Sequence, residues 1–200
     1  MMKKIIFATS NQGKVREIKE ILKDEDCEIV SLKEAGIDVD IVEDGETFEE
    51  NALIKANTIM KLTNTIVLAD DSGLEVDYLD KKPGIYSARF LGEDTPQIEK
   101  NKYILEKLKN VEEEKRTARF ICSVACAIPN KESFTVRGIL EGKIAHTMDG
   151  DNGFGYDPIF YVEEYNKTVA ELNSEEKNKI SHRGKALRHM RDKIKNLGIL

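Results

Sequence analysis

The order of apolar and amphipathic segments along the chain is the feature that most restricts its fold. Residues 3–9 have the continuous apolar character of a buried strand, and residues 13–23 place their apolar side chains on one helical face. We expect a second strand at residues 28–32 and a longer helix, opened by a capping box, at residues 47–62. Strands that alternate with helices in this way are typical of an α/β sheet.

The second half of the chain adds a different pattern. Residues 119–128 and 133–144 are two long strand-like runs separated by a Pro-Asn-Lys turn, and this spacing predicts a hairpin. Helical patterns follow at residues 174–180 and 183–197. A hairpin inserted into an alternating pattern predicts a mixed sheet rather than a purely parallel one.

The composition limits the classes of protein to which the chain can belong. Its 200 residues are enough for one domain, or for two lobes that share one core, and we expect a single domain over residues 1–200. A net charge of −6 disfavours nucleic acid as a partner, although a local basic cluster can still hold a small anion. The apolar runs are too short to span a bilayer and no secretory signal is evident, so we expect a cytoplasmic protein with no membrane partner. The odd number and the spacing of the three cysteines indicate neither a disulfide framework nor a zinc site, and the apolar run around Cys122 and Cys126 predicts that these two are buried, reduced thiols.

A strand-to-helix junction offers the first candidate site. It comprises Thr9, Ser10, Asn11, Gln12, Gly13 and Lys14. The first turn of a helix exposes backbone N–H groups and the positive end of the helix dipole, so the junction suits a phosphate, to which Lys14 adds a charge. The segment lacks the spacing of a Walker A loop. Taken alone, it is better explained by a helix cap at Ser10 or Asn11 and a solvated Lys14.

Two adjacent acids, Asp70 and Asp71, follow an apolar strand at residues 65–69. Ligand sites of α/β proteins lie at such strand ends, and neighbouring carboxylates stay ionised only beside a cation, for which oxygen ligands favour Mg²⁺. An ordinary turn explains the Asp, Ser and Gly residues here equally well. If the strand geometry persists through both acids, their side chains point to opposite faces and only one of them can face a bound water.

Two further residues are candidates only in combination with these acids. Glu43 lies in an acidic segment before the longer helix and could add a metal carboxylate, but a solvated loop is the simpler explanation of that segment. Lys55 lies on the helix itself, where a lysine is most often a solvated surface residue.

A glycine-rich loop could present an aromatic ring to a nucleic base. Glycines on both sides of Phe154 can leave its ring exposed for stacking, and Asp157 can accept a hydrogen bond from a base N–H. The alternative is a tight turn in which Phe154 is buried. Further along the chain, Lys177, His182 and Arg183 bring cations to a break between two helices, where they could contact a base oxygen or a phosphate.

Each of these motifs is a weak signal alone, but their residues and their order along the chain are specific in combination. The segments are TSNQGK at residues 9–14, ADDSG at 69–73, PGIYSAR at 83–89, GFGYDPIF at 153–160 and SHRG at 181–184. Together they closely resemble the motifs of the inosine/xanthosine triphosphate pyrophosphatase family. The resemblance extends from about residue 5 to residue 197.

The resemblance implies a fold and an activity. The implied fold is a two-lobed α/β structure with a long mixed central sheet flanked by helices and a cleft between the lobes, assembled as a homodimer. The implied activity is Mg²⁺-dependent hydrolysis of non-canonical purine nucleoside triphosphates (ITP, dITP and XTP) to the monophosphate and pyrophosphate, which cleanses the nucleotide pool.

The resemblance also implies a role for each motif. The junction at residues 9–14 cradles the triphosphate, which Lys55 also reaches. Glu43 and Asp71 hold the metal, Asp71 acts as general base, and Ser72 contacts the substrate. The base pocket consists of Phe154, Gly155, Tyr156, Asp157, Lys177, His182 and Arg183.

Two departures from the family pattern leave the groups needed for the chemistry in place. Ser10 stands where the family more often has Gly, and Asp80-Lys81-Lys82 stands where small residues are more usual. Two other functions remain open: a nucleotide sensor that does not hydrolyse its ligand, and a metal-dependent phosphatase that acts on another phosphoester.

Overall fold

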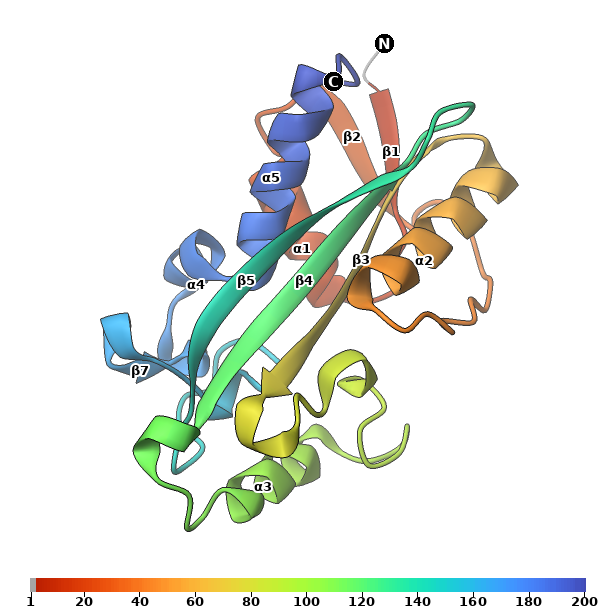
Figure 1. Ribbon diagram of the computed structural model, residues 1–200. Coiled ribbons are helices and arrows are strands. Elements are labelled where there is room, and N and C mark those ends of the chain that lie inside the picture. Colours follow the sequence, from red (N-terminus) through yellow and green to blue (C-terminus); the bar gives the residue numbers. More distant parts are fainter. Residues whose placement is uncertain (1–2) are drawn as a thin grey trace. The chain divides into compact units, whose positions relative to one another are not determined.

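The computed structural model describes residues 3–200, which form two compact units. Unit 1 contains the described chain up to Asp71 together with Cys122–Gly138 and His182–Leu200, and unit 2 contains Ser72–Ile121 and Ile139–Ser181. A seven-stranded sheet in the order β2-β1-β3-β4-β5-β6-β7 supplies strands to both units (Figure 1).

Unit 1 contains the parallel strand pairings of the sheet. β1 (Lys3–Phe7) pairs in parallel with β2 (Cys27–Ser31) on one side and with β3 (Ile66–Val76) on the other. The helices α1 (Gln12–Ile21) and α2 (Phe48–Thr63) connect these strands. The alternation of strands and helices expected from the sequence is therefore confirmed in this unit.

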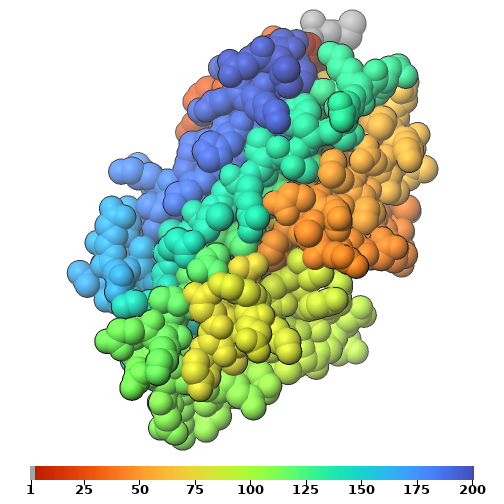
Figure 2. Space-filling view, in the orientation of Figure 1, coloured from red at the N-terminus to blue at the C-terminus, as the bar shows by residue number. Residues whose placement is uncertain are grey.

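Helices pack on both faces of the strands in unit 1. α1 and α5 (His182–Asn196) share one apolar core with the sheet, in which Ile18 and Met190 are buried together with Phe7. α2 belongs to a second core, on the other side of the strands, through small side chains such as Ala52. The outer side of α2 forms part of the molecular surface in Figure 2 (orange).

Unit 2 contains antiparallel strand pairings of the sheet. β4 (Thr117–Ala127) and β5 (Phe134–Ile144), which run through both units, are neighbours in the sheet at the position of the expected hairpin. β6 (Phe160–Val162) pairs antiparallel with β5 and with the short β7 (Lys167–Thr168). Parallel and antiparallel pairs together make the sheet mixed, as predicted.

Two helices and a separate apolar core complete unit 2. The helices are α3 (Gln97–Lys107) and α4 (Ser174–Ile180). In the core, the rings of Phe120 and Phe160 stack with their centroids 4.3 Å apart. Within residues 3–200, no helix is long and apolar enough to cross a membrane.

The three cysteines are free thiols, as the sequence predicts. Cys122 and Cys126 are fully buried, on the face of β4 that packs in the α1 and α5 core. Burial raises the pKa of Cys126 to about 12, so this thiol stays protonated and unreactive near neutral pH.

β3 differs from the expected strand and turn. The sequence pattern predicts a strand at residues 65–69 and is consistent with a turn at residues 70–73. The structure instead has one strand that runs through Ile66–Val76. The strand lies between β1 and β4 in the sheet, and each of the two carboxylates meets cations from other elements. Such tertiary partners cannot be read from the local pattern.

Candidate active site

The junction between β1 and α1 is organised by Asn11. Its side-chain oxygen accepts hydrogen bonds from the backbone N–H groups of Gly13, at 2.8 Å, and Lys14, at 3.2 Å. The hydroxyl of Thr9 accepts from the N–H of Asn11 at 3.2 Å. The cap predicted at this point is therefore confirmed at Asn11. Ser10 and Gln12 are exposed, so solvent and ligands can reach the first turn of the helix.

The simplest explanation of the motif placed Lys14 in solvent, but its side chain instead turns toward a carboxylate. Its ammonium nitrogen lies 2.9 Å from Oδ2 of Asp70, whose side chain is fully buried. The same carboxylate oxygen accepts from Nε of Arg183 at 3.1 Å, and Nη1 of Arg183 lies 2.7 Å from Glu17. The buried carboxylate of Asp70 thus links the candidate phosphate-binding junction before α1 to the start of α5.

The pKa of Asp70 reflects this arrangement. Burial alone would raise it, but the charges of Lys14, Arg183 and Lys55 hold it well below its ordinary value. Asp70 is therefore ionised at neutral pH and serves as a buried counter-ion for the surrounding cations.

Asp71, the next residue, meets a different set of partners. Its Oδ1 lies 3.5 Å from the ammonium of Lys55, and its Oδ2 accepts from the side-chain amide of Asn51 at 3.2 Å. The expectation that adjacent acids on a continuing strand face opposite ways is confirmed by these separate partners. Burial raises the pKa of Asp71 above its ordinary value, Glu43 adds to the rise and Lys55 opposes it.

Lys55 connects Asp71 to Glu43. Its ammonium lies 2.7 Å from Oε2 of Glu43, and the lysine is only 9% exposed. Burial would lower the pKa of Lys55, but the carboxylates of Asp71, Asp70 and Glu43 together raise it. A solvated surface lysine, the simplest explanation from sequence alone, is therefore wrong for this residue.

The carboxylates of Glu43 and Asp71 can hold a divalent cation. Both have an oxygen within 3.5 Å of one ammonium nitrogen, so a cation can reach both groups. Among residues 3–200, no group of three or more His, Cys, Asp or Glu side chains is arranged to enclose a metal. Two carboxylates without a complete protein cage suit Mg²⁺, which takes its remaining ligands from water and substrate phosphates.

Unit 2 holds the glycine-rich loop. The backbone N–H of Phe154 donates to Oδ2 of Asp157 at 2.8 Å, and the ammonium of Lys177 reaches the same oxygen at 2.8 Å. This ammonium also lies 4.5 Å from the centroid of the Phe154 ring, and Phe154 is 40% exposed. The alternative of a buried Phe154 is therefore wrong, and an aromatic surface is available in this unit.

Backbone conformation explains the first glycine of the loop. Gly153 has a φ of +80°, and a Cβ added there would lie 2.1 Å from Oδ2 of Asp157. Only glycine allows the chain to wrap so closely around this carboxylate. Tyr156, by contrast, is buried, and its hydroxyl donates a hydrogen bond to the backbone oxygen of Ser87 at 2.8 Å. This side chain therefore anchors the loop to the interior of unit 2.

The candidate residues thus gather in two groups. In unit 1 the structure places the 9–14 junction, Glu43, Lys55, Asp71, His182 and Arg183, and in unit 2 it places Ser72, residues 154–157 and Lys177. Arg183 contacts Asp70 and Glu17, which the sequence did not indicate, and its assignment to a base pocket stays a prediction.

Sequence reasoning missed two members of the unit 1 site. Asn51 precedes Lys55 by one helical turn and faces the same carboxylate, and Glu17 follows Lys14 on the exposed start of α1. The spacing of Asn51 and Lys55 on the expected helix at residues 47–62 is a usable signal, because residues four apart share a helix face.

The fold and these contacts together define a class of α/β proteins in which a charged site suited to a phosphorylated ligand, and able to hold a divalent cation, lies beside the parallel strands. The Ham1 family model matches residues 5–193, and the chain belongs to the Ham1 family. The resemblance carried by the sequence motifs is thereby confirmed.

Proteins of known name and structure extend this assignment. A dITP/XTP pyrophosphatase of Clostridium perfringens is 52% identical over 202 residues, covering 98% of this chain and 99% of that protein. The dITP/XTP pyrophosphatase of Bacillus subtilis is 52% identical over 193 residues, covering 95% of this chain and 96% of that protein. The structure of the Staphylococcus aureus Ham1 protein matches with a TM-score of 0.88 at 41% identity, covering 97% of this chain and 99% of that one. A HAM1 protein from Coxiella burnetii matches with a TM-score of 0.89 at 39% identity, covering 98% of this chain and all of the other.

Proposed function

We propose that this protein hydrolyses the non-canonical purine nucleoside triphosphates ITP, dITP and XTP to the nucleoside monophosphate and pyrophosphate. The observation that carries the proposal is the buried lysine, Lys55, shared by the carboxylates of Glu43 and Asp71. Such a group suits a phosphate chain with its cation, and relatives that are 52% identical are named dITP/XTP pyrophosphatases.

The triphosphate is held by the junction at residues 9–14 in this proposal. The N-terminus of α1 offers backbone N–H groups and the positive end of a helix dipole to the phosphate oxygens. The ammonium of Lys14, which is anchored by Asp70, adds a fixed positive charge, and Lys55 adds a second. Cations already held in place by buried carboxylates lose little side-chain freedom when the phosphates bind.

Glu43 and Asp71 would hold Mg²⁺. When bound, this ion neutralises charge that builds up on the phosphate and leaving-group oxygens. Lys14 and Lys55 do the same from the protein side, because an ammonium near a developing oxyanion stabilises the transition state more than the ground state. Ser72 would add a hydroxyl contact to the substrate.

Asp71 is the general base of the proposed reaction. It accepts a proton from a water molecule, the water oxygen bonds to phosphorus, and the anhydride bond between the α and β phosphates breaks, so that pyrophosphate leaves with the bond's electron pair. Asp70 cannot take this role, because its carboxylate is fully buried and engaged by Lys14 and Arg183. The structure thus favours the same acid as the family resemblance.

The side chains that recognise the base in this proposal lie first of all in unit 2. The half-exposed ring of Phe154 provides a stacking surface, and the neighbouring ammonium of Lys177 can donate to the 6-oxygen of hypoxanthine or xanthine. Gly155 and Asp157 belong to the same loop, and the family resemblance assigns His182 and Arg183 to base recognition as well. Adenine carries an amine at position 6 and would leave these donors unpaired, a mismatch that lowers the rate by orders of magnitude.

A substrate panel tests the proposal. The protein is incubated with Mg²⁺ and ITP, dITP, XTP, GTP or ATP, and phosphate is measured with and without added inorganic pyrophosphatase. We expect release from ITP, dITP and XTP only when the pyrophosphatase is present. Direct release of orthophosphate would instead indicate a phosphatase acting on another bond, and tight binding with no release under either condition would indicate a sensor.

We further propose a cytoplasmic homodimer that forms one functional domain over residues 1–200. The family resemblance supports the dimer, and the net charge of −6 supports a nucleotide rather than a nucleic acid as the partner. Light scattering during size-exclusion chromatography measures the assembly state, for which we expect twice the chain mass of 22.7 kDa.

A further inference from the structure

The side chain of Asn51 joins the two segments that carry the carboxylates of unit 1. Asn51 is on the first turn and a half of α2 and is only 1% exposed. Its Oδ1 accepts from the backbone N–H of Gly45 at 2.9 Å, and its Nδ2 donates to Oδ2 of Asp71 at 3.2 Å. One amide therefore contacts both the loop that carries Glu43 and the strand that carries Asp71.

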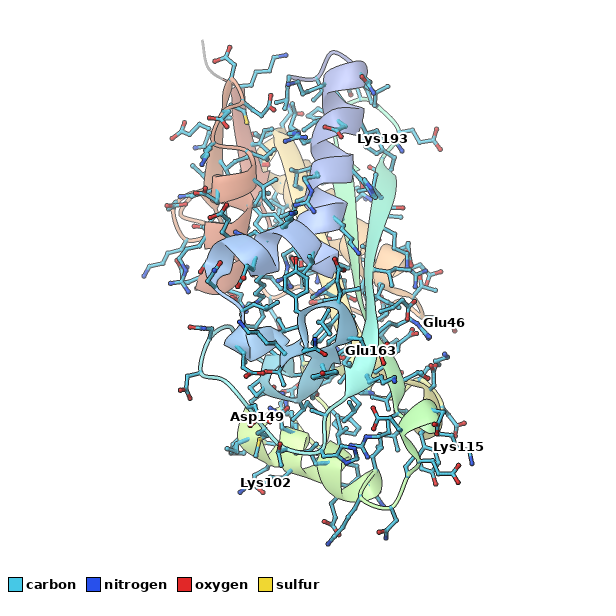
Figure 3. The ribbon with its side chains drawn as sticks, turned by 90° about the vertical axis from the view of Figure 1, so that its left-hand side faces the viewer. Glu46, Lys102, Lys115, Asp149, Glu163 and Lys193 are labelled. Atoms are coloured by element: carbon cyan, nitrogen blue, oxygen red, sulfur yellow. The ribbon has the colours of Figure 1, made fainter. Side chains whose placement is uncertain are left out.

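The loop before α2 is held by further contacts to the same helix. The carboxylate of Glu50 accepts from the backbone N–H groups of Glu46, at 2.7 Å, and Thr47, at 3.2 Å. A Cβ added to Gly45 would lie 2.7 Å from Cβ of Glu50 and 2.8 Å from Oδ1 of Asn51. The loop, whose Glu46 is labelled at the surface in Figure 3, thus lies against α2 as closely as glycine allows.

The orientation of the Asn51 amide follows from its partners. The N–H of Gly45 can only donate, so the oxygen of the amide must face it and the NH₂ group must face Asp71. Oδ2 of Asp71 is occupied in this way by a neutral donor. Oδ1 is left to face Lys55, which lies one helical turn beyond Asn51 and also contacts Glu43.

We propose that Asn51 is a positioning residue that sets Glu43 and Asp71 at the correct separation and turns Oδ1 of Asp71 toward the cation and the attacking water. This inference rests on the proposed function, in which these two carboxylates hold Mg²⁺. Partners that orient the ligands of a metal, without touching the metal, have effects of this kind in other proteins.

A neutral amide suits this position better than a charged side chain. Lys55 already supplies a positive charge to the pair, and a second cation at position 51 would compete with the divalent ion. The amide fixes one oxygen of Asp71 and leaves the charge of the carboxylate available.

Direct cation binding tests the inference. Mn²⁺ is titrated into the full-length protein without nucleotide, and free Mn²⁺ is followed by electron paramagnetic resonance. The variant Asn51→Leu removes both hydrogen bonds at similar side-chain size, and Asn51→Ala removes them with a residue that favours helix. Asn57→Leu is the matched control, since Asn57 lies on the same helix and accepts from Ser133 instead.

We expect both Asn51 variants to bind Mn²⁺ about 10–100-fold more weakly than the wild type, with Asn57→Leu within about twofold of it. With ITP as substrate, kcat should fall in parallel while KM for the nucleotide changes by less than about threefold, because the phosphate junction is left intact. Circular dichroism melts establish that the variants are folded at the assay temperature.

The outcomes separate this inference from the proposed function. A folded Asn51→Leu or Asn51→Ala protein with wild-type Mn²⁺ affinity and wild-type kcat overturns the role of Asn51 alone. Wild-type protein that binds Mn²⁺ but hydrolyses no ITP, dITP or XTP overturns the proposed function, and weaker Mn²⁺ binding by the variants still supports the positioning role. If the Glu43→Gln variant binds Mn²⁺ as tightly as the wild type does, the carboxylate pair holds no cation and both proposals fail.

Discussion

Replacing Asp70 with Asn tests whether the buried counter-ion at the centre of unit 1 is essential to its stability. The change keeps the shape of the side chain but removes a negative charge that lies 2.9 Å from Lys14 and 3.1 Å from Arg183. Removing one partner of a buried ion pair typically costs about 3–5 kcal/mol. We expect the lower end, about 3 kcal/mol, because Arg183 keeps Glu17 and the side chain of Lys14 is 17% exposed and can turn toward water.

Differential scanning calorimetry at pH 7 measures this cost. For a chain of this length, a loss of about 3 kcal/mol lowers Tm by roughly 6–12 °C. The control is Glu106→Gln, which removes an ion pair between Glu106 and Lys109 whose side chains are 74% and 66% exposed. Exposed pairs contribute about 0–1 kcal/mol, so Tm of the control should stay close to that of the wild type.

The pH dependence provides an independent check on Asp70. Its folded pKa lies below the unfolded value of about 3.9, so its contribution is complete above that pH and is lost as the pH falls toward the folded pKa. Between pH 7 and pH 3 the stability gap between wild type and Asp70→Asn should narrow by about 1 kcal/mol. A variant with wild-type Tm at pH 7, or a gap that widens in acid, would refute the counter-ion role.

Three further substitutions test other parts of the site. Asp71→Asn should lower kcat by at least about 100-fold while nucleotide binding, measured by calorimetry, largely survives; substantial turnover would remove Asp71 as general base. Phe154→Ala should weaken substrate binding by roughly 1–3 kcal/mol because a base stack is lost, and an unchanged KM would place Phe154 outside the pocket. Gly45→Ala should raise the Mg²⁺ concentration needed for half-maximal activity, because the added methyl group displaces the loop from Glu50 and Asn51; an unaltered Mg²⁺ dependence would show that the loop's position does not affect the cation.

Much of unit 1 could be predicted from the sequence because its signals are local. The helix at residues 47–62 is α2 within one residue at each end, and its capping box forms between Thr47 and Glu50 as expected. Asn11, one of the two residues predicted as the cap, caps α1. Caps and helical periodicity involve residues within four positions of one another, so the chain alone determines them.

The partners of the charged residues could not be predicted in the same way. Asp70 and Asp71 were equally consistent with a turn, whereas in the structure they lie within a strand and meet cations from α1, α2 and α5. Lys55 resembled a surface lysine because nothing near it in sequence indicates that Glu43 and Asp71 enclose it. Contacts of this kind join segments far apart in the chain. The family resemblance assigned Glu43, Lys55 and Asp71 to one site, whereas the residue patterns alone did not.

The proposed activity is defined by which bond of the substrate is broken. Phosphorus-31 NMR of XTP or ITP incubated with the protein and Mg²⁺ follows every product at once. We predict that the monophosphate and pyrophosphate appear together in equal amounts, with no nucleoside diphosphate and no orthophosphate. Accumulation of the diphosphate with orthophosphate would show cleavage at the outer anhydride bond and would contradict the proposed activity.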